Sequence, residues 1–404
     1  MRCALQFRIW LTLALMLLAV AEQCQGQSPT APKDQRLQAL ALEQQGKNAD
    51  AEVAWRLYLQ DHSSSPEPYA HLGLLEARQE HYTEAVALYR KALAIKPANS
   101  GVHLNLGLAL FKSGDMKQAI AEFQPLLAKQ PTGTAENQRL TILIGMAYYG
   151  LADYAEAIPY LQRAAVTDTQ NLPLRMTLAH CYLWTKQYQY VLDTYHEILM
   201  LGAESAESDM LAGEALDAMK DNFGAIQQFR AAVKADPKLP GAHFSLGYLL
   251  WTQKQFTEAA TEFQAELVND SEAAQAMAYL ADIDLQRQQS EAALPLLEKA
   301  IRIDPSIEQA HLDLGVLYAD AGRSEDALRE LKVAESQAPE DVNIHWRLGR
   351  LYRTMGKTEE AKSEFEKASQ INKKANDDLI NRTGPGGKNP PPATPSVTPA
   401  DEMK

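Results

Sequence analysis

The sequence predicts an all-α fold made of stacked pairs of short helices. Three observations support this prediction. Val and Ile are sparse beside the helix formers Ala, Leu, Glu and Gln. A small residue, Gly or Ala, recurs every 34 residues over most of the chain, and prolines recur in the same phase. One helix pair cannot bury its own apolar face, so repeats of this length must stack to form a continuous core.

The small residue marks one position of every repeat. It is Ala39, Gly73, Gly107, Gly145, Ala179, Gly213, Gly247, Ala281, Gly315 and Gly349. Each step between neighbours is 34 residues, except that the step from Gly107 to Gly145 is four residues longer. We expect that insertion at Thr132–Asn137. The ten occurrences of this residue predict about ten repeats.

Two further positions keep the same phase. Twelve residues after the small one come Ala51, Ala85, Ala119, Ala157, Val191, Ala225, Ala259, Ala293, Ala327 and Ala361. Four residues further on come Trp55, Tyr89, Phe123, Leu161, Tyr195, Phe229, Phe263, Leu297, Leu331 and Phe365. Two antiparallel helices that cross closely need little bulk at the crossing, and a large residue one turn away fills the space beyond it. Five repeats close with a proline, which cannot continue a helix, at Pro97, Pro131, Pro237, Pro305 and Pro339.

The pattern Leu-Gly-x2-Tyr…Ala-x3-Phe…Pro resembles the tetratricopeptide repeat family. Its helical part is complete in the segment with Leu348, Gly349, Tyr352, Ala361 and Phe365. The resemblance covers Pro32 to Lys373. It implies a right-handed superhelical α-solenoid that binds other proteins or peptides.

The N-terminus resembles an export signal. Arg2 and Arg8 precede the apolar run Ile9–Val20, and small residues at Ala19 and Ala21 predict cleavage before Glu22. Twelve apolar residues are too few to span a bilayer comfortably, since about 20 are needed, although an uncleaved anchor is the alternative. A lipoprotein signal is excluded because Gln23 precedes Cys24. We therefore expect a signal peptide at residues 1–21 and an exported protein, periplasmic or extracellular.

The remaining boundaries follow from composition. Residues 22–31 form a short linker, and residues 32–381 form the solenoid, whose last helix is extended through Leu379 as a cap. Residues 382–404 contain Gly384-Pro385-Gly386-Gly387 and are then rich in Pro and Thr, which predicts a disordered tail. The tail is expected to be a spacer, with a proline-rich ligand as the alternative.

The net charge limits the kinds of partner, and the cysteine content limits the possible disulfides. The formal net charge is −13 and becomes −15 when residues 1–21, with two arginines and no acid, are removed. Such a field repels nucleic acid, so we expect none among the partners. No stable membrane insertion is expected after signal cleavage, and the oligomeric state is not predicted. The three cysteines, Cys3, Cys24 and Cys181, cannot build a disulfide framework, and Cys181 is expected to be a small core residue.

No motif for catalysis is present. The sequence lacks a His-Glu-x-x-His zinc motif, a Gly-rich phosphate loop and a Gly-x-Ser-x-Gly elbow. His103, His243, His311 and His345 share one repeat position, which indicates a packing role instead of metal binding. We expect no enzyme activity, no cofactor and no metal site.

The resemblance implies that the first helix of each repeat lines a concave, peptide-binding groove. Its groove positions here are Leu74, Leu104, Leu108, Phe111, Ile142, Met146, Tyr149, Met176, Trp184, Met210, Phe244, Tyr248 and Trp251, with Asn105 at the position of the family's asparagine ladder. Such an apolar stripe is typical of an interaction site. The alternative is that tight winding buries part of the stripe between neighbouring first helices.

Charged residues distinguish the later repeats. Glu214, Asp217, Asp282, Asp313 and Asp320 make this part of the groove acidic. Arg347, Arg350 and Arg353 form a basic stripe that could receive a carboxylate or phosphate, but we expect it to pair with Asp313 and Asp320 of the preceding repeat. The function predicted is a non-catalytic scaffold or assembly adaptor of the cell envelope. The alternative is a targeting or regulatory subunit of an envelope enzyme or of polysaccharide-export machinery.

Overall fold

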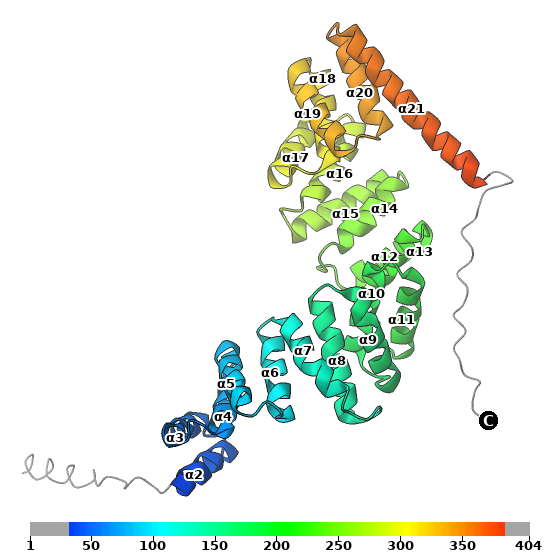
Figure 1. Cartoon of the computed structure of the whole chain (residues 1–404). Coiled ribbons are helices and arrows are strands. Elements are labelled where there is room, and N and C mark those ends of the chain that lie inside the picture. Colours follow the sequence, from blue (N-terminus) through cyan, green and yellow to red (C-terminus); the bar gives the residue numbers. More distant parts are fainter. Residues whose placement is uncertain (1–31, 384–404) are drawn as a thin grey trace, which may run out of the picture. The chain divides into compact units, whose positions relative to one another are not determined.

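The computed structural model describes residues 32–383, and these residues form helices and no strands. They divide into two compact units, and the boundary along the chain falls within helix α11, between Tyr190 and Val191. The first unit contains α2 (Pro32–Gln44), α3 (Asn48–Asp61), α4 (Pro66–Arg78), α5 (Tyr82–Ile95), α6 (Ser100–Lys112), α7 (Met116–Leu127), α8 (Ala135–Gly150), α9 (Tyr154–Thr167) and α10 (Leu172–Trp184). Successive helices pack as the pairs α2/α3, α4/α5, α6/α7 and α8/α9 (Figure 1).

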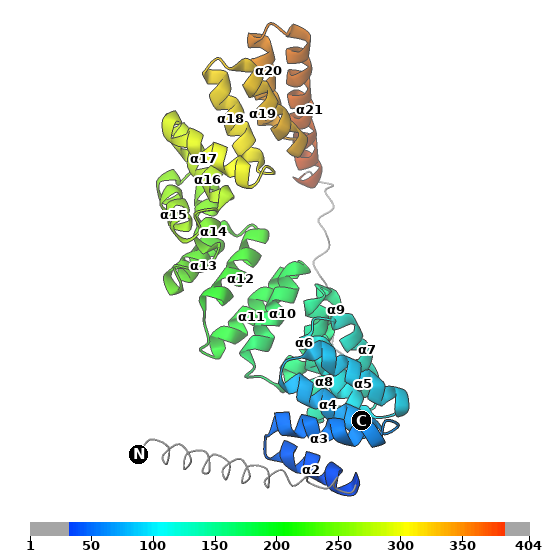
Figure 2. The same cartoon turned by 90° about the vertical axis from the view of Figure 1, so that its left-hand side faces the viewer.

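The second unit repeats the arrangement. After α11 (Tyr188–Met200) it contains α12 (Ala206–Ala218), α13 (Asn222–Ala235), α14 (Ala242–Thr252), α15 (Phe256–Asn269), α16 (Ala274–Gln286), α17 (Ser290–Ile303), α18 (Glu308–Asp320), α19 (Ser324–Gln337), α20 (Val342–Thr354) and α21 (Thr358–Thr383). Helices α18 to α21 lie side by side in both views, each packed on the next (Figures 1 and 2). The twenty helices α2 to α21 match the ten repeats that the sequence predicts.

The helix crossings confirm the role assigned to the small residue. A Cβ atom added at each glycine of this position would lie 2.4–2.9 Å from a side-chain carbon sixteen residues later. The pairs are Gly73 with Tyr89, Gly107 with Phe123, Gly145 with Leu161, Gly213 with Phe229, Gly247 with Phe263, Gly315 with Leu331 and Gly349 with Phe365. Carbon atoms in contact prefer about 3.5–4.0 Å. The two helices of a pair therefore approach as closely as they do because side-chain bulk is absent there.

The turn within each repeat always contains one residue in the left-handed region. These residues are Gly46, Glu80, Gly114, Ala152, Lys186, Lys220, Lys254, Gln288, Gly322 and Gly356, with φ between 57° and 89°. Only four are glycines, although the left-handed conformation costs other residues roughly 1–2 kcal/mol. The geometry of the hairpin is thus imposed by the packing of its helices, even where the local sequence opposes it.

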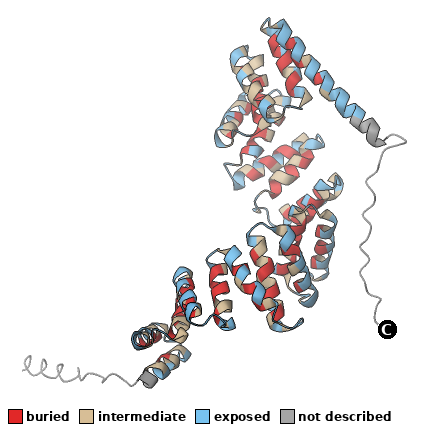
Figure 3. Ribbon diagram, in the orientation of Figure 1, coloured by how far each residue is buried: buried red, intermediate tan, exposed pale blue. Residues whose placement is uncertain are grey.

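The core lies both within and between the helix pairs, and Figure 3 marks its buried residues. Its largest fully buried side chains include Trp55, Tyr89, Phe123 and Phe263, all at the bulky position of the repeat. Buried side chains cover the inward faces of the helices, whereas α21 becomes exposed over residues 372–377.

The same polar contact occurs in four of the repeats. In each, a histidine of the first helix contacts a glutamate of the second helix through Nδ1 and the carbonyl of the preceding closing proline through Nε2. The sets are His103 with Glu122 and Pro97, His243 with Glu262 and Pro237, His311 with Glu330 and Pro305, and His345 with Glu364 and Pro339. The Nδ1–carboxylate distances are 2.5–2.8 Å. A carbonyl oxygen can only accept, so Nε2 donates, and each histidine links its helix pair to the turn before it.

The expected insertion is found where the phase breaks. Helix α8 begins at Ala135, inside the expected segment Thr132–Asn137, and has 16 residues where α4, α6 and α10 have 13. The Thr134 side chain caps it by accepting a hydrogen bond from the Asn137 amide. Three of the four inserted residues therefore lengthen the first helix of this repeat at its N-terminus.

The ends of the chain bear on several predictions. Helix α21 continues past Lys373 to Thr383, two residues beyond the boundary predicted at 381. The predicted signal peptide, the linker and nearly all of the tail lie outside the described residues. Within residues 32–383, none of the helices has the length and apolar character that a membrane span requires.

Candidate binding surface on the first helices

The predicted groove residues share an intermediate degree of exposure. All fourteen lie in the first helices of their repeats, and thirteen are partly buried, from Leu74 in α4 to Trp251 in α14. Trp184, at the end of α10, is 64% exposed. None of the fourteen is fully buried. Packing between neighbouring repeats therefore covers part of each side chain and leaves part of it at a surface.

In the first unit the surface combines aliphatic and aromatic side chains. Leu104, Leu108 and Phe111 pack against the core cluster formed around α5 to α8. Further along, the Tyr154 ring lies 5.7 Å from the Tyr149 ring and 5.8 Å from the Trp184 ring, measured between centroids. Packing against neighbouring helices thus buries part of each of these side chains, as the alternative prediction expects, and the rest of each side chain remains exposed.

In the second unit Glu266 fixes the start of helix α14. Its carboxylate accepts hydrogen bonds from the backbone amides of Gly241 and Phe244, at 3.2 and 3.1 Å. The first amides of a helix have no partner within it, and an acidic group is favourable at this end. The helix then presents Phe244, Tyr248 and Trp251 on one face, because these residues are four and three apart.

A fourth aromatic residue, Tyr279 of α16, completes this face. Its ring centroid lies 4.9 Å from that of Trp251, 5.3 Å from that of Tyr248 and 6.1 Å from that of Phe244. We call Phe244, Tyr248, Trp251 and Tyr279 the aromatic face. Sequence reasoning did not place Tyr279 on the surface, although it occupies the same repeat position as Asn105 and that position could have indicated it.

Carboxylates adjoin the aromatic face. Asp282, one turn after Tyr279, accepts hydrogen bonds from the Trp251 indole at 2.6 Å and from the Gln286 amide at 2.7 Å. Asp313 of α18 is only 6% exposed and accepts from the Gln309 amide at 3.0 Å. Burial raises the pKa of Asp282, and burial with the charge of Asp282 raises the pKa of Asp313 well above its usual range. Both carboxylates are thus held where their charged forms are poorly solvated.

The arginines of α20 do not form the expected ion pairs. Among the ion pairs between described residues, none includes Arg347, Arg350 or Arg353. The charge of Arg347 lowers the pKa of Asp313, but burial outweighs it. Arg347 and Arg350 instead line a hollow of about 350 Å³ together with Asp320 and apolar side chains such as Val316.

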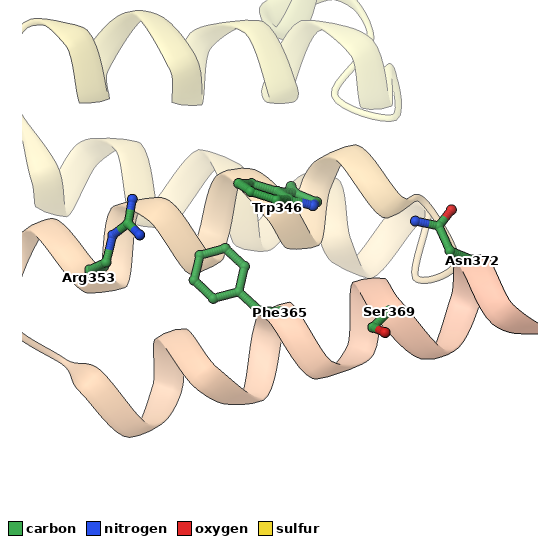
Figure 4. A pocket seen from close by; sticks show the side chains of 5 residues that line it. All are labelled: Trp346, Arg353, Phe365, Ser369 and Asn372. Carbon is green, nitrogen blue, oxygen red and sulfur yellow. The ribbon is translucent and has the colours of Figure 1, made fainter.

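Arg353 faces a different hollow, at the end of the second unit. Figure 4 shows it on α20 with Trp346, opposite Phe365, Ser369 and Asn372 of α21. The hollow measures about 480 Å³, and the Arg353 guanidinium lies 5.9 Å from the centroid of the Phe365 ring. The three arginines predicted as one anion contact are therefore divided between two hollows.

One group of potential metal ligands occurs in the described part of the chain. Glu335, His345 and Glu364 place ligand atoms within 4.8 Å of one another. Lys332 lies 2.6 Å from a Glu335 oxygen, and Lys367 lies 3.1 Å from Glu335 and 3.0 Å from Glu364. Two ammonium groups therefore balance the two carboxylates, and the group is an ion-pair network to which we assign no metal.

Cys181 is fully buried in α10, as the sequence predicts. Burial raises the pKa of its thiol to about 12. A thiol in this state is not a nucleophile at neutral pH, because the reactive form is the thiolate.

Comparison with known families decides the classification. One model of the tetratricopeptide repeat matches residues 76–140, 148–214 and 284–345. A second matches residues 36–100, 210–276 and 244–308, and a third matches residues 342–374. The chain belongs to the tetratricopeptide repeat family. Proteins of this family generally act as scaffolds or adaptors for protein interactions.

Individual relatives are distant. BBSome complex member BBS4 of Bos taurus is 23% identical over 226 residues, which are 48% of this chain and 44% of that protein. Anaphase-promoting complex subunit 3 of Schizosaccharomyces pombe is 24% identical over 170 residues, 42% of this chain and 25% of that protein. The chain spans less than half the length of these relatives. The crystal structure of the APC/C hetero-tetramer Cut9-Hcn1 is 11% identical, covers 87% of this chain and 89% of that chain, and has a TM-score of 0.43.

Proposed function

We propose that this tetratricopeptide repeat protein is a non-catalytic scaffold or assembly adaptor of the cell envelope. It is exported by the signal at residues 1–21 and acts in the periplasm or outside the cell. In each unit, an extended or helical segment of a partner protein lies along the first helices, against the apolar stripe. The observation that supports this most is the incomplete burial of all fourteen stripe residues. Large apolar side chains on a first-helix surface favour a partner that would cover them.

The stripe can be tested within both units at once. Alanine replaces Phe111 and Tyr149 in the first unit and Tyr248 and Trp251 in the second, and proteins captured from envelope extracts are compared with those of the wild type. The proposal predicts loss of partners. The matched control replaces Phe223 and Val268, which are 76% and 85% exposed on second helices, and it should retain them. Unchanged capture by the stripe variant would show that partners bind elsewhere.

The anion contact is a finer proposal. Arg347 and Arg350 line one hollow without an ion pair, so they can receive a carboxylate or phosphate of the same partner. Alanine at both positions should weaken partner binding, and the effect should diminish as the salt concentration rises.

A second function class is favoured by exposed apolar residues on the other helices. Val166, Met200, Phe223 and Val268 lie on second helices and are 76–88% exposed. A targeting or regulatory subunit of an envelope enzyme or of polysaccharide-export machinery would use such a surface. In that case, the control variant of the capture experiment would lose an enzyme that co-purifies with the wild type.

A further inference from the structure

The aromatic face of the second unit offers three ring systems to a ligand. Tyr279 meets the other two rings edge to face, with interplanar angles of 70° to Tyr248 and 63° to Trp251. The Tyr248 and Trp251 rings are stacked, with an interplanar angle of 21°. All three are only partly buried. The faces of tyrosine and tryptophan rings attract cations, because the π electrons make them electronegative.

Three carboxylates surround the same tyrosine. Asp282 follows Tyr279 by one helical turn, and Glu308 and Asp313 come from the next first helix, α18. Burial, followed by the charges of Tyr248, Glu308, Asp282 and Asp313, raises the pKa of Tyr279 to about 12. The negative charge is therefore concentrated next to the aromatic face.

These carboxylates form no ion pair among the described residues. The hydrogen-bond donors to Asp282 and Asp313 are the neutral side chains of Trp251, Gln286 and Gln309. Glu308 has one oxygen, Oε1, that is buried and without a hydrogen-bond partner. The charge of Arg347 acts on Asp313, but Arg347 forms no ion pair with it. Desolvated carboxylates without a counter-charge are unfavourable, so a cation at this place would stabilise them.

The arrangement does not suit a metal ion. The ligand atoms of Asp282, Glu308 and Asp313 do not converge, because the one group of described residues with such convergence is Glu335, His345 and Glu364. Carboxylates spread around an aromatic wall suit an organic cation, whose alkyl stem packs on the rings while its charged end reaches the oxygens.

We propose that the aromatic face and its carboxylates take a lysine or arginine side chain from the partner segment. This inference rests on the proposed function, because it specifies the partner that the stripe of the second unit would hold. The charge complementarity excludes an acidic segment at this place and gives the partner a basic residue there. In this proposal Asp282 has two roles: it accepts the hydrogen bond from the Trp251 indole and it contacts the cation.

The test uses the Trp251 indole as a reporter in the full-length protein. Tryptophan is labelled with ¹⁵N, and the Trp251 indole signal is assigned by its absence in Trp251→Phe. The probes are Nα-acetyl-lysine methylamide, Nα-acetyl-arginine methylamide and the uncharged Nα-acetyl-norleucine methylamide. We expect a saturable shift of this signal with the lysine or arginine probe and none with the norleucine probe. An equal response to all three probes, or none to any, would overturn the proposal.

Variants locate the binding. Asp282→Asn and Asp313→Asn keep the side-chain shape and should each weaken binding of the cationic probe about tenfold, as expected when a charged hydrogen-bond partner is lost. Glu325→Gln removes the same charge from an exposed position on α19 and should leave binding unchanged. Equal effects of all three variants would refute a local site, since the attraction would then be long-range.

The two proposals fail in different ways. If alanine substitution of the stripe abolishes partner capture but the cationic probes do not shift the Trp251 signal, the scaffold function stands and the proposed preference for a lysine or arginine side chain is wrong. If the probes bind but the stripe variant captures every partner, the cation site exists and the proposed function is wrong.

Discussion

The close helix crossing makes a quantitative prediction at Gly107. A Cβ added there would lie 2.4 Å from Cε1 of Phe123, whereas carbon contacts prefer about 3.5 Å or more. The Phe123 ring, which is fully buried, would have to withdraw by about 1.1 Å. Overpacking of this kind costs about 1–3 kcal/mol, and the helix propensity of alanine returns about 1 kcal/mol. The net loss is therefore at most about 2 kcal/mol, and we expect Gly107→Ala to lower the free energy of unfolding by about 1–2 kcal/mol.

A matched control lies in the same helix. A Cβ at Gly101 would meet only Asn99 Oδ1, at an ordinary 3.6 Å, so Gly101→Ala should be neutral or stabilising by about 0.5 kcal/mol. Gly247→Ala, with a closest approach of 2.9 Å to Phe263, should cost less than Gly107→Ala. The double variant Gly107→Ala, Phe123→Leu should recover part of the loss, because Ala281 and Leu297 already coexist in one core cluster.

The assay is urea unfolding followed by circular dichroism, with hydrogen exchange to localise the effect. Repeat arrays can unfold in parts, so a single transition need not report the variant repeat. Faster exchange should be confined to α6, α7 and their neighbours. If Gly107→Ala and Gly101→Ala had the same effect, the crossing would not depend on the absence of a side chain, and the packing argument would be refuted.

Three further predictions concern turns and charges. Ala152→Gly should raise the free energy of unfolding by about 0.5 kcal/mol, because Ala152 is left-handed at φ 57°, whereas Gly114→Ala at the equivalent turn should lower it. Burial opposes protonation of His103, but its hydrogen bonds to Glu122 and to the Pro97 carbonyl outweigh burial and raise its pKa. Protonated His103 therefore stabilises the fold, and this stabilisation is lost as the pH rises through the raised pKa. His103→Ala should therefore lower the melting temperature more at about pH 5 than at about pH 8. The raised pKa of Asp313 likewise makes stability fall as pH rises, because ionisation of the buried carboxyl is unfavourable. Unlike His103→Ala, Asp313→Asn should therefore raise the melting temperature at neutral pH, and it should have no such effect at about pH 4.

The repeat architecture could be predicted because it rests on residues that are regular in the sequence. Gly73 and Tyr89 lie in different helices, yet their spacing of sixteen recurs in every repeat and reflects one packing contact. The insertion before Gly145 was also visible, since it breaks the phase. The residues of the first-helix stripe, from Leu74 to Trp251, followed instead from the resemblance to the family, and the structure leaves thirteen of the fourteen partly buried and Trp184 exposed.

Contacts between side chains on different helices could not be predicted where the sequence pattern does not show which residues meet. The shared position of four histidines was visible, but their glutamate and proline partners lie nineteen residues later and six residues earlier. Tyr279 joins the aromatic face only because α14 and α16 pack on one another. The left-handed conformation of Lys220 and Lys254 is likewise set by helix packing and not by local preference.

Photo-crosslinking tests most directly whether the first-helix stripe is the surface that holds a partner. A photoreactive amino acid replaces Leu108 or Tyr248 on the stripe, or Val166 or Val268 on second helices, in the full-length protein expressed in its own cell. The proposed function predicts that the stripe positions crosslink to a partner protein and that the second-helix positions do not. Crosslinks from Val166 and Val268 alone would contradict it.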